Sequence, residues 1–585
     1  MKQDKTKLIL LMCLLFNLAV FLILCILGKP MFATNDDYRM RLIISGAYTG
    51  IPSGEAVFIS YILGSILALL YKVLPNFEWY GFFTMASMYI PVCLCEYIFL
   101  KRTKKIKEIF ERSVIIIIFT FIILQKHILM PQFTITSAFW SMLAIAAAIE
   151  MFNIYYSNHV ISKKWRVIFV VSCILSCLIR KKVFYLCIPM LILLFVIYWQ
   201  KYRQIFKKNF ILLIVGIIFA IFVNEGIGMA LNLNPEYKEF SDYNKARSSI
   251  YDYSGVPDYW ENEEFYKELG IDEAAWENLN NRTFDISESL NTENLEKIYD
   301  YAQSIENKAL GYKVWNSIND IRSIMAGKNV FLETVAFGLI MAILLSEKIW
   351  KIRDNEKQLV VSFIIYIIIV IIGFAFIGRI VDRIVEALFL FVIGAAFSAG
   401  SNTIYTEEKP WFYAWKFSVT SRLLLNLGMI CIAIVAIIAN QYTLQRDNDG
   451  LRALVIKRTN CLEELTKYMD DREDDFLFYN ALDFIAGSEK VFTTRENRIL
   501  NIDSLGNWNV FSPNYFARNE QFDFSSAIEG LCDSDNVYYA EIGEYHANIG
   551  SELEKRGKIL QCVDELYVDE DTIYIYKVEN KTEGE

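Results

Sequence analysis

The sequence contains no glycine-rich phosphate-binding loop, no Ser-His-Asp order and no histidine-rich metal motif, and only 3 of its 585 residues are His. Nucleotide chemistry in the cytoplasm is therefore unsupported, and we expect no nucleic acid among the partners. Most of the 11 Cys lie inside apolar runs, where a thiol is usually a small hydrophobic group, and none has zinc-type spacing. Cys532 and Cys562 lie in the polar tail, and the sequence allows one disulfide between them without requiring it.

Long apolar runs are what the sequence has in abundance. Hydrophobic residues make up 54% of the chain and aromatic residues 15%, although the formal net charge is −9. A soluble acidic protein would not carry so many apolar runs, so the charge must be concentrated in loops and a tail between lipid-facing helices. These features predict a multi-pass membrane protein.

A membrane-spanning helix needs about 20 predominantly apolar residues. Suitable runs lie near residues 8–28, 78–100, 113–130, 133–152, 165–179, 183–199, 209–224, 329–346, 358–377, 383–400 and 419–440. The first run could also be a signal peptide, but it is long and no clear small-residue cleavage site follows it. We therefore interpret it as a retained anchor.

The basic residues predict the orientation, because Lys and Arg collect in the cytoplasmic loops of membrane proteins. Basic residues occur at the N-terminus and in loops at 101–107, 163–166, 201–208 and 347–357. All of these lie on one side only if the apolar stretch 55–74 does not cross the membrane. We interpret 55–74 as a juxtamembrane or re-entrant helix on the outer side. The N-terminus is then cytoplasmic, and the acidic tail is extracytoplasmic.

The expected fold is an α-helical polytopic membrane protein with about 11 transmembrane helices, a helical outer loop domain and a small α/β C-terminal domain. The predicted parts are a membrane module at 1–224 with a first outer loop at 29–77, a large outer loop at 225–328, further membrane helices at 329–440 and a soluble tail at 441–585. In the large loop, the pattern predicts helices near 259–269 and 291–309, with helix starts at Asp285 and Asn291. In the tail it predicts helices at 462–469 and 547–556 and strands at 537–541 and 572–578.

The adjacent carboxylates Asp36 and Asp37 lie just beyond the first span, on the predicted outer face. Two carboxylates at the mouth of a membrane span are costly to desolvate unless water, a metal or a cation meets them. Either could accept a proton from an attacking hydroxyl, or ligate a hard divalent cation such as Mg²⁺ or Mn²⁺. The alternative is a solvated loop pair, or a partner for Arg39, which we also place among the substrate-binding candidates.

Several other polar groups are predicted at outer ends of spans. Arg180, Lys181 and Lys182 form a basic cluster that breaks the positive-inside bias. This favours an anionic ligand such as a lipid phosphate, with snorkelling to lipid head groups as the alternative. Arg379, Asp382, Arg383 and Glu386 have helical spacing and should share one face; they either hold a phosphate or pair with each other. Weaker candidates for substrate binding are His127, Gln132 and Arg247.

The order of features in residues 1–200 resembles that of GT-C-type membrane glycosyltransferases, the class of aminoarabinose transferases and protein O-mannosyltransferases. The resemblance lies in an acidic first outer loop (Asp36-Asp37), the stretch Gly50–Gly54 leading into a juxtamembrane helix that ends near Tyr71, and a return to the basic loop 101–107. It implies transfer of a sugar from a polyprenyl-phosphate donor, with Asp36 or Asp37 as base or metal ligand. By position, Arg180 and Arg379 would hold the lipid phosphate.

The sequence therefore favours an enzyme of the plasma membrane that transfers a sugar to a cell-envelope glycan or protein. The partners would be the bilayer, the lipid-linked donor and that acceptor. A transporter or flippase of lipid-linked glycans would need charged residues at mid-membrane depth, whereas the notable charges gather at one face. A non-catalytic cell-envelope scaffold is the third alternative.

Overall fold

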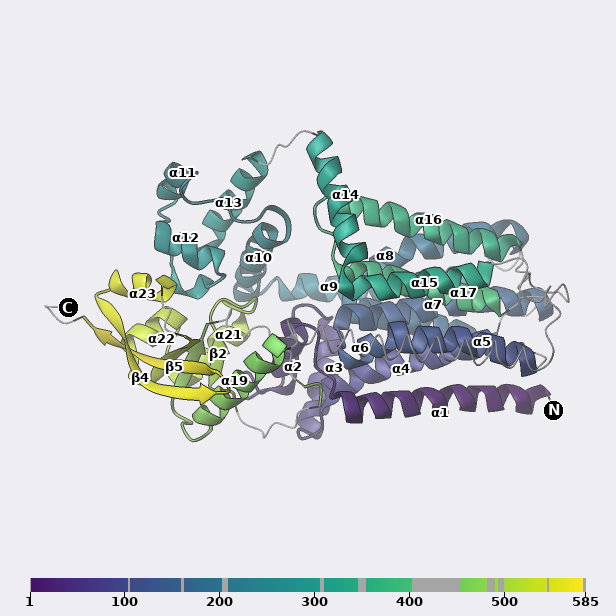
Figure 1. The fold of residues 1–585 in the computed structure, drawn as a ribbon, viewed down its shortest axis with the longest axis horizontal. Helices are drawn as coiled ribbons and strands as arrows, with labels where there is room; N and C mark the ends of the chain where they lie inside the picture. Colours follow the sequence, from purple (N-terminus) through teal and green to yellow (C-terminus); the bar gives the residue numbers. More distant parts are fainter. Residues whose placement is uncertain are drawn as a thin grey trace.

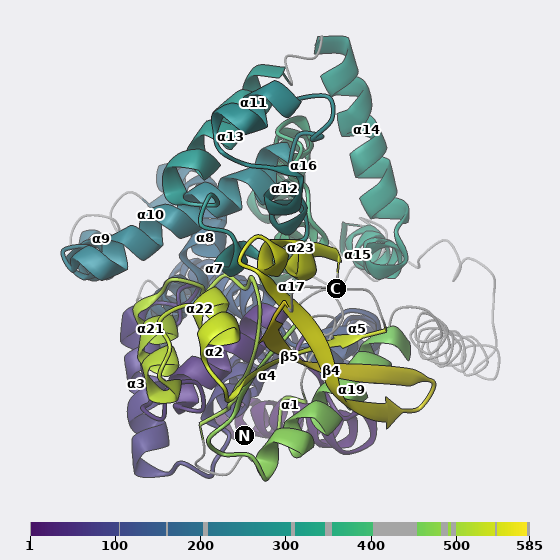
Figure 2. The same cartoon turned by 90° about the vertical axis from the view of Figure 1, so that its left-hand side faces the viewer.

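The computed structural model describes residues 2–103, 106–158, 162–202, 209–305, 310–345, 354–401, 453–480, 490–492, 499–543 and 547–581. Long helices run side by side through one half of the molecule, and a sheet with shorter helices forms the other half (Figure 1). Figure 2 shows α10–α13 and the sheet in front of the ends of the long helices. We call these ends the sheet side of the bundle; it is the side predicted to face outward.

Eight helices in the described residues are long and apolar enough to cross a membrane, when α8 is counted once. The bundle is built from α1 (Lys2–Gly28), α4 (Trp79–Leu100), α5 (Ile106–Ile118), the π-helical segment η1 (Phe119–Leu124), α6 (Gln125–Leu129), α7 (Phe133–Asn158), α8 (Lys163–Tyr202), α9 (Asn209–Leu231), α15 (Lys328–Leu345), α16 (Asp354–Phe376) and α17 (Asp382–Gly400). The predicted span 419–440 lies outside the described residues, so the total of eleven stays a prediction.

α7 and α17 form the centre of the bundle, where small residues allow close packing. α7 contains the run Ala144–Ala148, and its membrane-spanning part is completely buried. A side chain at Gly394 of α17 would collide with the backbone carbonyl of Met142 in α7. Small residues permit this approach, as in other membrane helix pairs.

α8 turns back on itself at Arg180, whose φ of −154° and ψ of 94° are not helical. The rings of Phe169 and Phe195 lie 6.4 Å apart, although a straight helix would separate these residues by about 39 Å. The two limbs therefore run antiparallel, as predicted for separate spans at 165–179 and 183–199. Arg180 lies at the turn between them.

The stretch predicted not to cross the membrane contains α3 (Tyr61–Val73), which is only 13 residues long. At 1.5 Å per residue it extends about 20 Å, too short for a hydrocarbon core of about 30 Å. Before α3, the chain packs tightly against it, because a side chain at Gly64 would collide with the carbonyl of Gly54. The structure confirms that 55–74 contains a short helix rather than a span.

The loop that the sequence predicts to lie outside the membrane is helical. It contains α10 (Pro235–Ser249), the π-helical segment η3 (Ile250–Ser254), α11 (Glu263–Glu268), α12 (Glu273–Asn280), the 3₁₀ segment η4 (Phe284–Ile286), α13 (Thr292–Ile305) and α14 (Leu310–Ala326). The Asn291 side chain accepts a hydrogen bond from the Asn294 amide, which confirms the predicted start of α13. The predicted start at Asp285 is wrong, because Asp285 is buried within η4 and accepts from the Gly506 amide instead.

The C-terminal part has the predicted α/β character. Its five strands have the order β2-β1-β3-β5-β4, with β1 (Phe476–Tyr479), β2 (Ile502–Ser504) and β3 (Val537–Ile542) parallel, and β4 (Lys558–Val568) and β5 (Asp571–Asn580) antiparallel additions. The helices are α19 (Ala453–Asp470), α21 (Pro513–Asn519), α22 (Ala527–Asp533) and α23 (Ala547–Glu554), with the 3₁₀ segment η7 (Glu520–Phe522). The structure confirms the four elements predicted here, which are β3, β5, α19 and α23. A separate helix, α2 (Asn35–Ser45), contacts the sheet through the ion pair of Arg39 with Asp503.

Cys532 and Cys562 are both free thiols, so they do not form the disulfide that the sequence left open. Cys532 is buried in α22, whereas Cys562 is exposed on β4.

Cys562 therefore offers a test of the predicted orientation. In intact cells that produce the chain, we expect a membrane-impermeant maleimide to label the wild type but not Cys562→Ser, because the sheet would face outward. Labelling of Cys562 only after lysis would reverse the orientation.

Candidate active site

Asp37 is completely buried in the first turn of α2, and all of its hydrogen bonds are made inside the protein. Its carboxylate accepts from the Tyr80 hydroxyl at 2.8 Å, the Thr34 hydroxyl at 3.0 Å and the Phe133 amide at 3.1 Å. Burial raises the pKa of Asp37 to about 7, although these hydrogen bonds oppose the rise. Asp37 therefore ties α2 to the first turns of α4 and α7.

Asp36, one position earlier, has a different environment. It is half-buried, and its carboxylate makes no hydrogen bond or ion pair with the described residues. Burial raises the pKa of Asp36, and the positive charges of Arg383, Arg180 and Arg247 oppose this rise. Asp36 is thus the member of the pair that faces basic groups from α8, α10 and α17.

Arg180 is held by aromatic rings at the turn of α8. Its guanidinium carbon lies 5.2 Å from the ring centre of Phe58 and 4.9 Å from that of Phe133, and it donates a hydrogen bond of 3.4 Å to the Phe58 carbonyl. Aromatic faces attract guanidinium groups while leaving their edges available to an anion. The ring of Trp508, from the loop after β2, packs on Phe58 at 4.8 Å.

The turn that presents Phe58 is strained. Val57 has a φ of 58°, which is unusual for a β-branched residue, and the Phe58 amide donates to the Ala56 carbonyl at 2.6 Å. Such strain is typical of functional sites and costs about 1–3 kcal/mol. The strained residue, Val57, directly precedes Phe58, which contacts Arg180.

The remaining arginines come from different elements. Arg247 on α10 donates to the Asn244 side chain at 2.7 Å, and burial lowers the pKa of Arg247. Arg379 forms an ion pair with Asp252 and lies 4.5 Å from the ring centre of Tyr253.

The predicted common helical face of Arg379, Asp382, Arg383 and Glu386 is wrong in part. α17 begins only at Asp382, and Arg379 lies in the preceding loop after Gly378, whose φ is 77°. Asp382 and Arg383 are half-buried in the first turn, while Glu386 points to Lys126. The loop places Arg379 beside η3 rather than over the helix.

Positive charge gathers around Asp36. Arg180, Arg247 and Arg383 act on its carboxylate, and Arg379 acts on Arg180. The neighbouring negative groups include Asp37 and Asp252. A group of guanidinium side chains suits an anionic ligand such as a phosphate. A divalent cation at Asp36 and Asp37 fits poorly, because four guanidinium groups would repel it and the oxygens of Asp37 already accept three hydrogen bonds.

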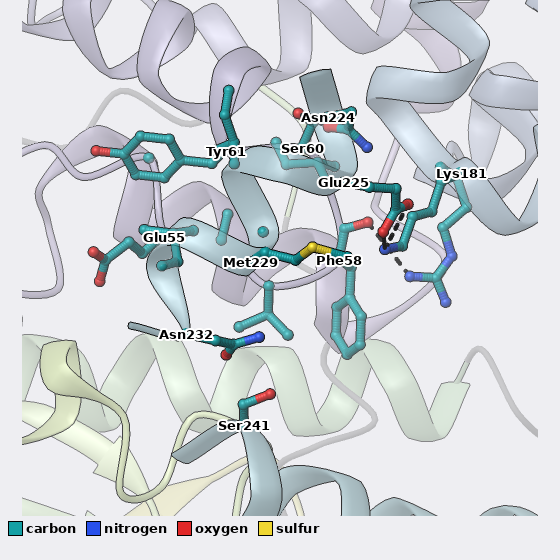
Figure 3. A pocket seen from close by; sticks show the side chains of 18 of the residues that line it. Glu55, Phe58, Ser60, Tyr61, Lys181, Asn224, Glu225, Met229, Asn232 and Ser241 are labelled. Atoms are coloured by element: carbon teal, nitrogen blue, oxygen red, sulfur yellow. Dashed lines mark hydrogen bonds and ion pairs between the residues drawn. The ribbon is translucent and has the colours of Figure 1, made fainter. Parts of the chain in front are cut away.

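Lys181 lies beside this cluster and lines a pocket of about 360 Å³ between the 54–61 segment, the turn of α8, α9 and α10. Lys181 forms an ion pair of 3.0 Å with Glu225, and Arg180 also lines the pocket (Figure 3). The pocket therefore reaches from the surface of α9 to the guanidinium that faces Asp36.

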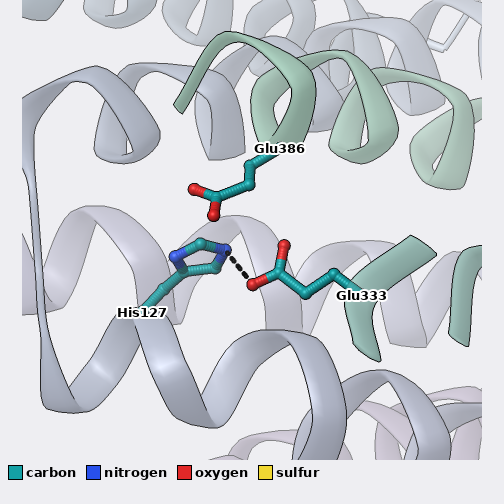
Figure 4. Close-up of side chains that lie close together, drawn as sticks. All are labelled: His127, Glu333 and Glu386. Carbon is teal, nitrogen blue, oxygen red and sulfur yellow. Dashed lines mark ion pairs between the residues drawn. The ribbon is translucent and has the colours of Figure 1, made fainter. Parts of the chain in front are cut away.

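His127 lies in a separate buried cluster with Glu333 and Glu386, whose ligand atoms lie within 4.8 Å of one another (Figure 4). The ammonium of Lys126 is 2.9 Å from Glu333 and also pairs with Glu386, so a cation is already present between the two carboxylates. His127 is 2% exposed and packs edge-on against Phe139. No hydrogen bond or ion pair joins His127 to Asp36 among the described residues.

Two further candidates occupy different positions. Arg39 pairs with Asp503 and donates to the Ser504 hydroxyl at 2.9 Å, which favours a role in joining α2 to the sheet. Gln132 is buried at the position before α7, next to the amide that Asp37 accepts from.

Sequence reasoning missed Phe58, Trp508 and the pairing of Arg379 with Asp252. No periodicity marks Phe58 among the 42 Phe of the chain. The Gly-Ile-Pro-Ser-Gly stretch just before it was the available signal, because glycines and a proline there predict an irregular loop close to the site.

No protein-family model matches the chain, and no curated protein matches it. Among solved structures, the chain is similar to ArnT from Cupriavidus metallidurans bound to undecaprenyl phosphate, with a TM-score of 0.37 and 9% sequence identity, over 96% of this chain and 97% of that one. Because the identity and the TM-score are low, this similarity does not bear on the roles of individual residues.

Proposed function

We propose that this chain transfers a sugar from a polyprenyl-phosphate donor to an acceptor hydroxyl, with Asp36 as the general base. The observation that carries the proposal is the half-buried Asp36, which has no hydrogen-bond or ion-pair partner in the described part of the chain and lies near Arg180, Arg247 and Arg383. A base needs a free carboxylate near its proton donor, and a leaving phosphate needs preorganised positive charge.

The group of arginines suits the change in charge during this reaction. A polyprenyl-phosphate sugar is a phosphodiester with one negative charge. When the acceptor oxygen bonds to the anomeric carbon, the bond from that carbon to the phosphate oxygen breaks, and the phosphate monoester leaves with a second negative charge. The arginines would stabilise this developing charge, while Asp36 takes the proton of the acceptor hydroxyl.

Burial supports the role of Asp36 by raising its pKa. A carboxylate with a raised pKa is a stronger base, provided that it is ionised at the working pH. Arg180 would hold the phosphate from a fixed position, because Phe58 and Phe133 restrict its guanidinium. The pocket beside Lys181 opens along α9, where the lipid chain could remain in the bilayer.

We further propose that arginines, rather than a divalent cation, supply the positive charge. Purified chain in detergent should release polyprenyl phosphate from a labelled polyprenyl-phosphate sugar when an envelope extract supplies the acceptor. Treatment with EDTA should change the rate by less than about twofold, because the four guanidinium groups remain.

The two results test different parts of the proposal. Movement of the intact donor across liposomes without release of phosphate would instead indicate a flippase. A loss of turnover in EDTA that Mg²⁺ or Mn²⁺ restores would overturn the arginine-based mechanism and leave sugar transfer in place.

A further inference from the structure

A second pocket, of about 250 Å³, lies between α10, the segment before α13 and the start of α21. It is lined by the carboxylates Glu236, Glu239 and Glu288 and by the rings of Tyr243, Phe511 and Phe516. It belongs to the soluble half of the molecule and shares no lining residue with the pocket beside Lys181. Neither the reaction at Asp36 nor the packing of the bundle explains it.

The rings form a continuous apolar wall. Phe511 packs edge-on against Tyr243 at 4.8 Å and lies 6.4 Å from Phe516. Phe511 has a φ of 63°, a strained conformation for a bulky residue that is typical of binding sites. Phe516 is 43% exposed, although a large aromatic side chain gains free energy from burial.

The three carboxylates make the pocket negatively charged. Glu236 and Glu239 are three residues apart on α10, so they lie on the same side of the helix, and neither carboxylate has a partner among the described residues. Glu288 pairs with Arg556 at 2.7 Å. None of the described residues that line the pocket is Lys or Arg, so the pocket would repel phosphorylated or uronic-acid ligands and attract a cationic one.

We propose that this pocket binds an amino-sugar unit of a glycan. The apolar C–H face of a pyranose ring would stack on Phe511 and Phe516, and its ammonium and hydroxyl groups would meet Glu236 and Glu239. The volume is below the roughly 300–1,000 Å³ of pockets for drug-sized ligands, which suits one sugar unit of a longer chain.

The pocket deepens the proposed function and rests on it, because it identifies the acceptor as an amino-sugar-containing glycan. α10 carries both Glu239, in the pocket, and Arg247, near Asp36. Eight residues of α-helix separate them by about 12 Å along the axis. A glycan held at Glu239 can therefore extend a neighbouring unit toward Asp36.

Saturation-transfer NMR on the purified full chain tests the pocket with a glucosamine trimer as the probe. We expect saturation transfer to the trimer, and affinity at least tenfold weaker in Phe516→Ala and in Glu239→Gln. Tyr567→Ala removes another exposed aromatic side chain from the same half of the molecule and should bind like the wild type. A galacturonate trimer should give no transfer.

Equal binding by the wild type and Phe516→Ala overturns the proposal, as does the absence of any transfer to the glucosamine trimer. Binding of trilysine with equal affinity also overturns it, because the pocket would then recognise a cation rather than a sugar. Asp36→Asn separates the two proposals: it should bind the trimer normally and lose turnover. Normal binding with normal turnover in this variant contradicts the catalytic proposal alone.

Discussion

Replacement of Asp36 by Asn is expected to lower turnover of the lipid-linked donor by about 10²- to 10⁴-fold, the usual contribution of a general base. The amide has nearly the same shape as the carboxylate but cannot accept the proton of the acceptor hydroxyl. Folding should be unaffected, because Asp36 is half-buried and has no partner among the described residues. The measurements are release of polyprenyl phosphate and the thermal unfolding midpoint in detergent.

Asp37→Asn is the matched control, because it makes the same chemical change one residue away. The Asn amide group would face the Tyr80, Thr34 and Phe133 donors that the carboxylate now accepts from. A buried mismatch of this kind costs about 1–3 kcal/mol, so this variant should unfold at a lower temperature. Wild-type turnover in Asp36→Asn, or turnover lost equally in both variants at equal stability, would contradict the assignment of Asp36 as base.

The pH profile gives an independent readout of the same residue. The proposed base Asp36 would act only when it is deprotonated, and burial raises its pKa above the ordinary value. Activity should therefore fall as the pH drops through this raised pKa, and kcat/KM should show an acid limb that Asp36→Asn lacks. An unchanged limb in the residual activity of the variant would assign it to another group.

The positions of the membrane segments could be predicted from the sequence because they follow from local composition and charge. The short helix α3 is an example: basic loops on one side of the bilayer exclude a crossing at 55–74, and α3 has only 13 residues. The reversal at Arg180 was also predictable, because a charged triplet interrupts two apolar runs. Both inferences need only the cost of placing charge in lipid.

The roles of Asp36 and Asp37 could not be separated in this way. Successive residues of an α-helix point about 100° apart, so one of the pair faces α4 and α7 while the other faces the arginines. Which one does so depends on Tyr80 and Phe133, which are distant in sequence. The wrong helical face assigned to Arg379 has a local cause, since Gly378 ends the helical path before α17 begins.

The ion pair of Arg39 could not be predicted from local sequence patterns. Its partner Asp503 lies 464 positions later, in a three-residue strand. The sequence places Arg39 among the substrate-binding candidates because it lies close to Asp36 and Asp37. In the structure it points to the sheet instead, so proximity along α2 does not define a common site.

Asp503→Asn is expected to destabilise the protein by about 3–5 kcal/mol, because it leaves two buried guanidinium groups without a countercharge. Asp503 is 2% exposed and pairs with both Arg39 and Arg518, while it accepts from the Tyr48 hydroxyl at 2.9 Å and the Ser504 amide at 2.8 Å. Asp242→Asn is the control, because it breaks an exposed pair with Lys238 worth about 0.3–0.5 kcal/mol.

The unfolding midpoint in detergent should therefore fall sharply in Asp503→Asn and remain unchanged in Asp242→Asn. Burial alone would raise the pKa of Asp503, but Arg39 and Arg518 hold it below its ordinary value. Its stabilisation is then complete above the pKa of the unfolded chain and is lost only as the pH falls through the lower folded value. The deficit of the variant should thus be constant between pH 5 and about pH 8; equal midpoints for the variant and the wild type would contradict this role.

Loss of the ion pair between Arg39 and Asp503 should also lower turnover. Arg39 and Asp36 lie three residues apart on α2, so the contact with the sheet fixes the orientation of the helix that carries the base. A misplacement of about 1 Å at a reacting group can cost about 10²-fold in rate. Turnover in Asp503→Asn should therefore fall even at temperatures where the variant remains folded, whereas normal turnover there would show that α2 is oriented by Asp37 alone.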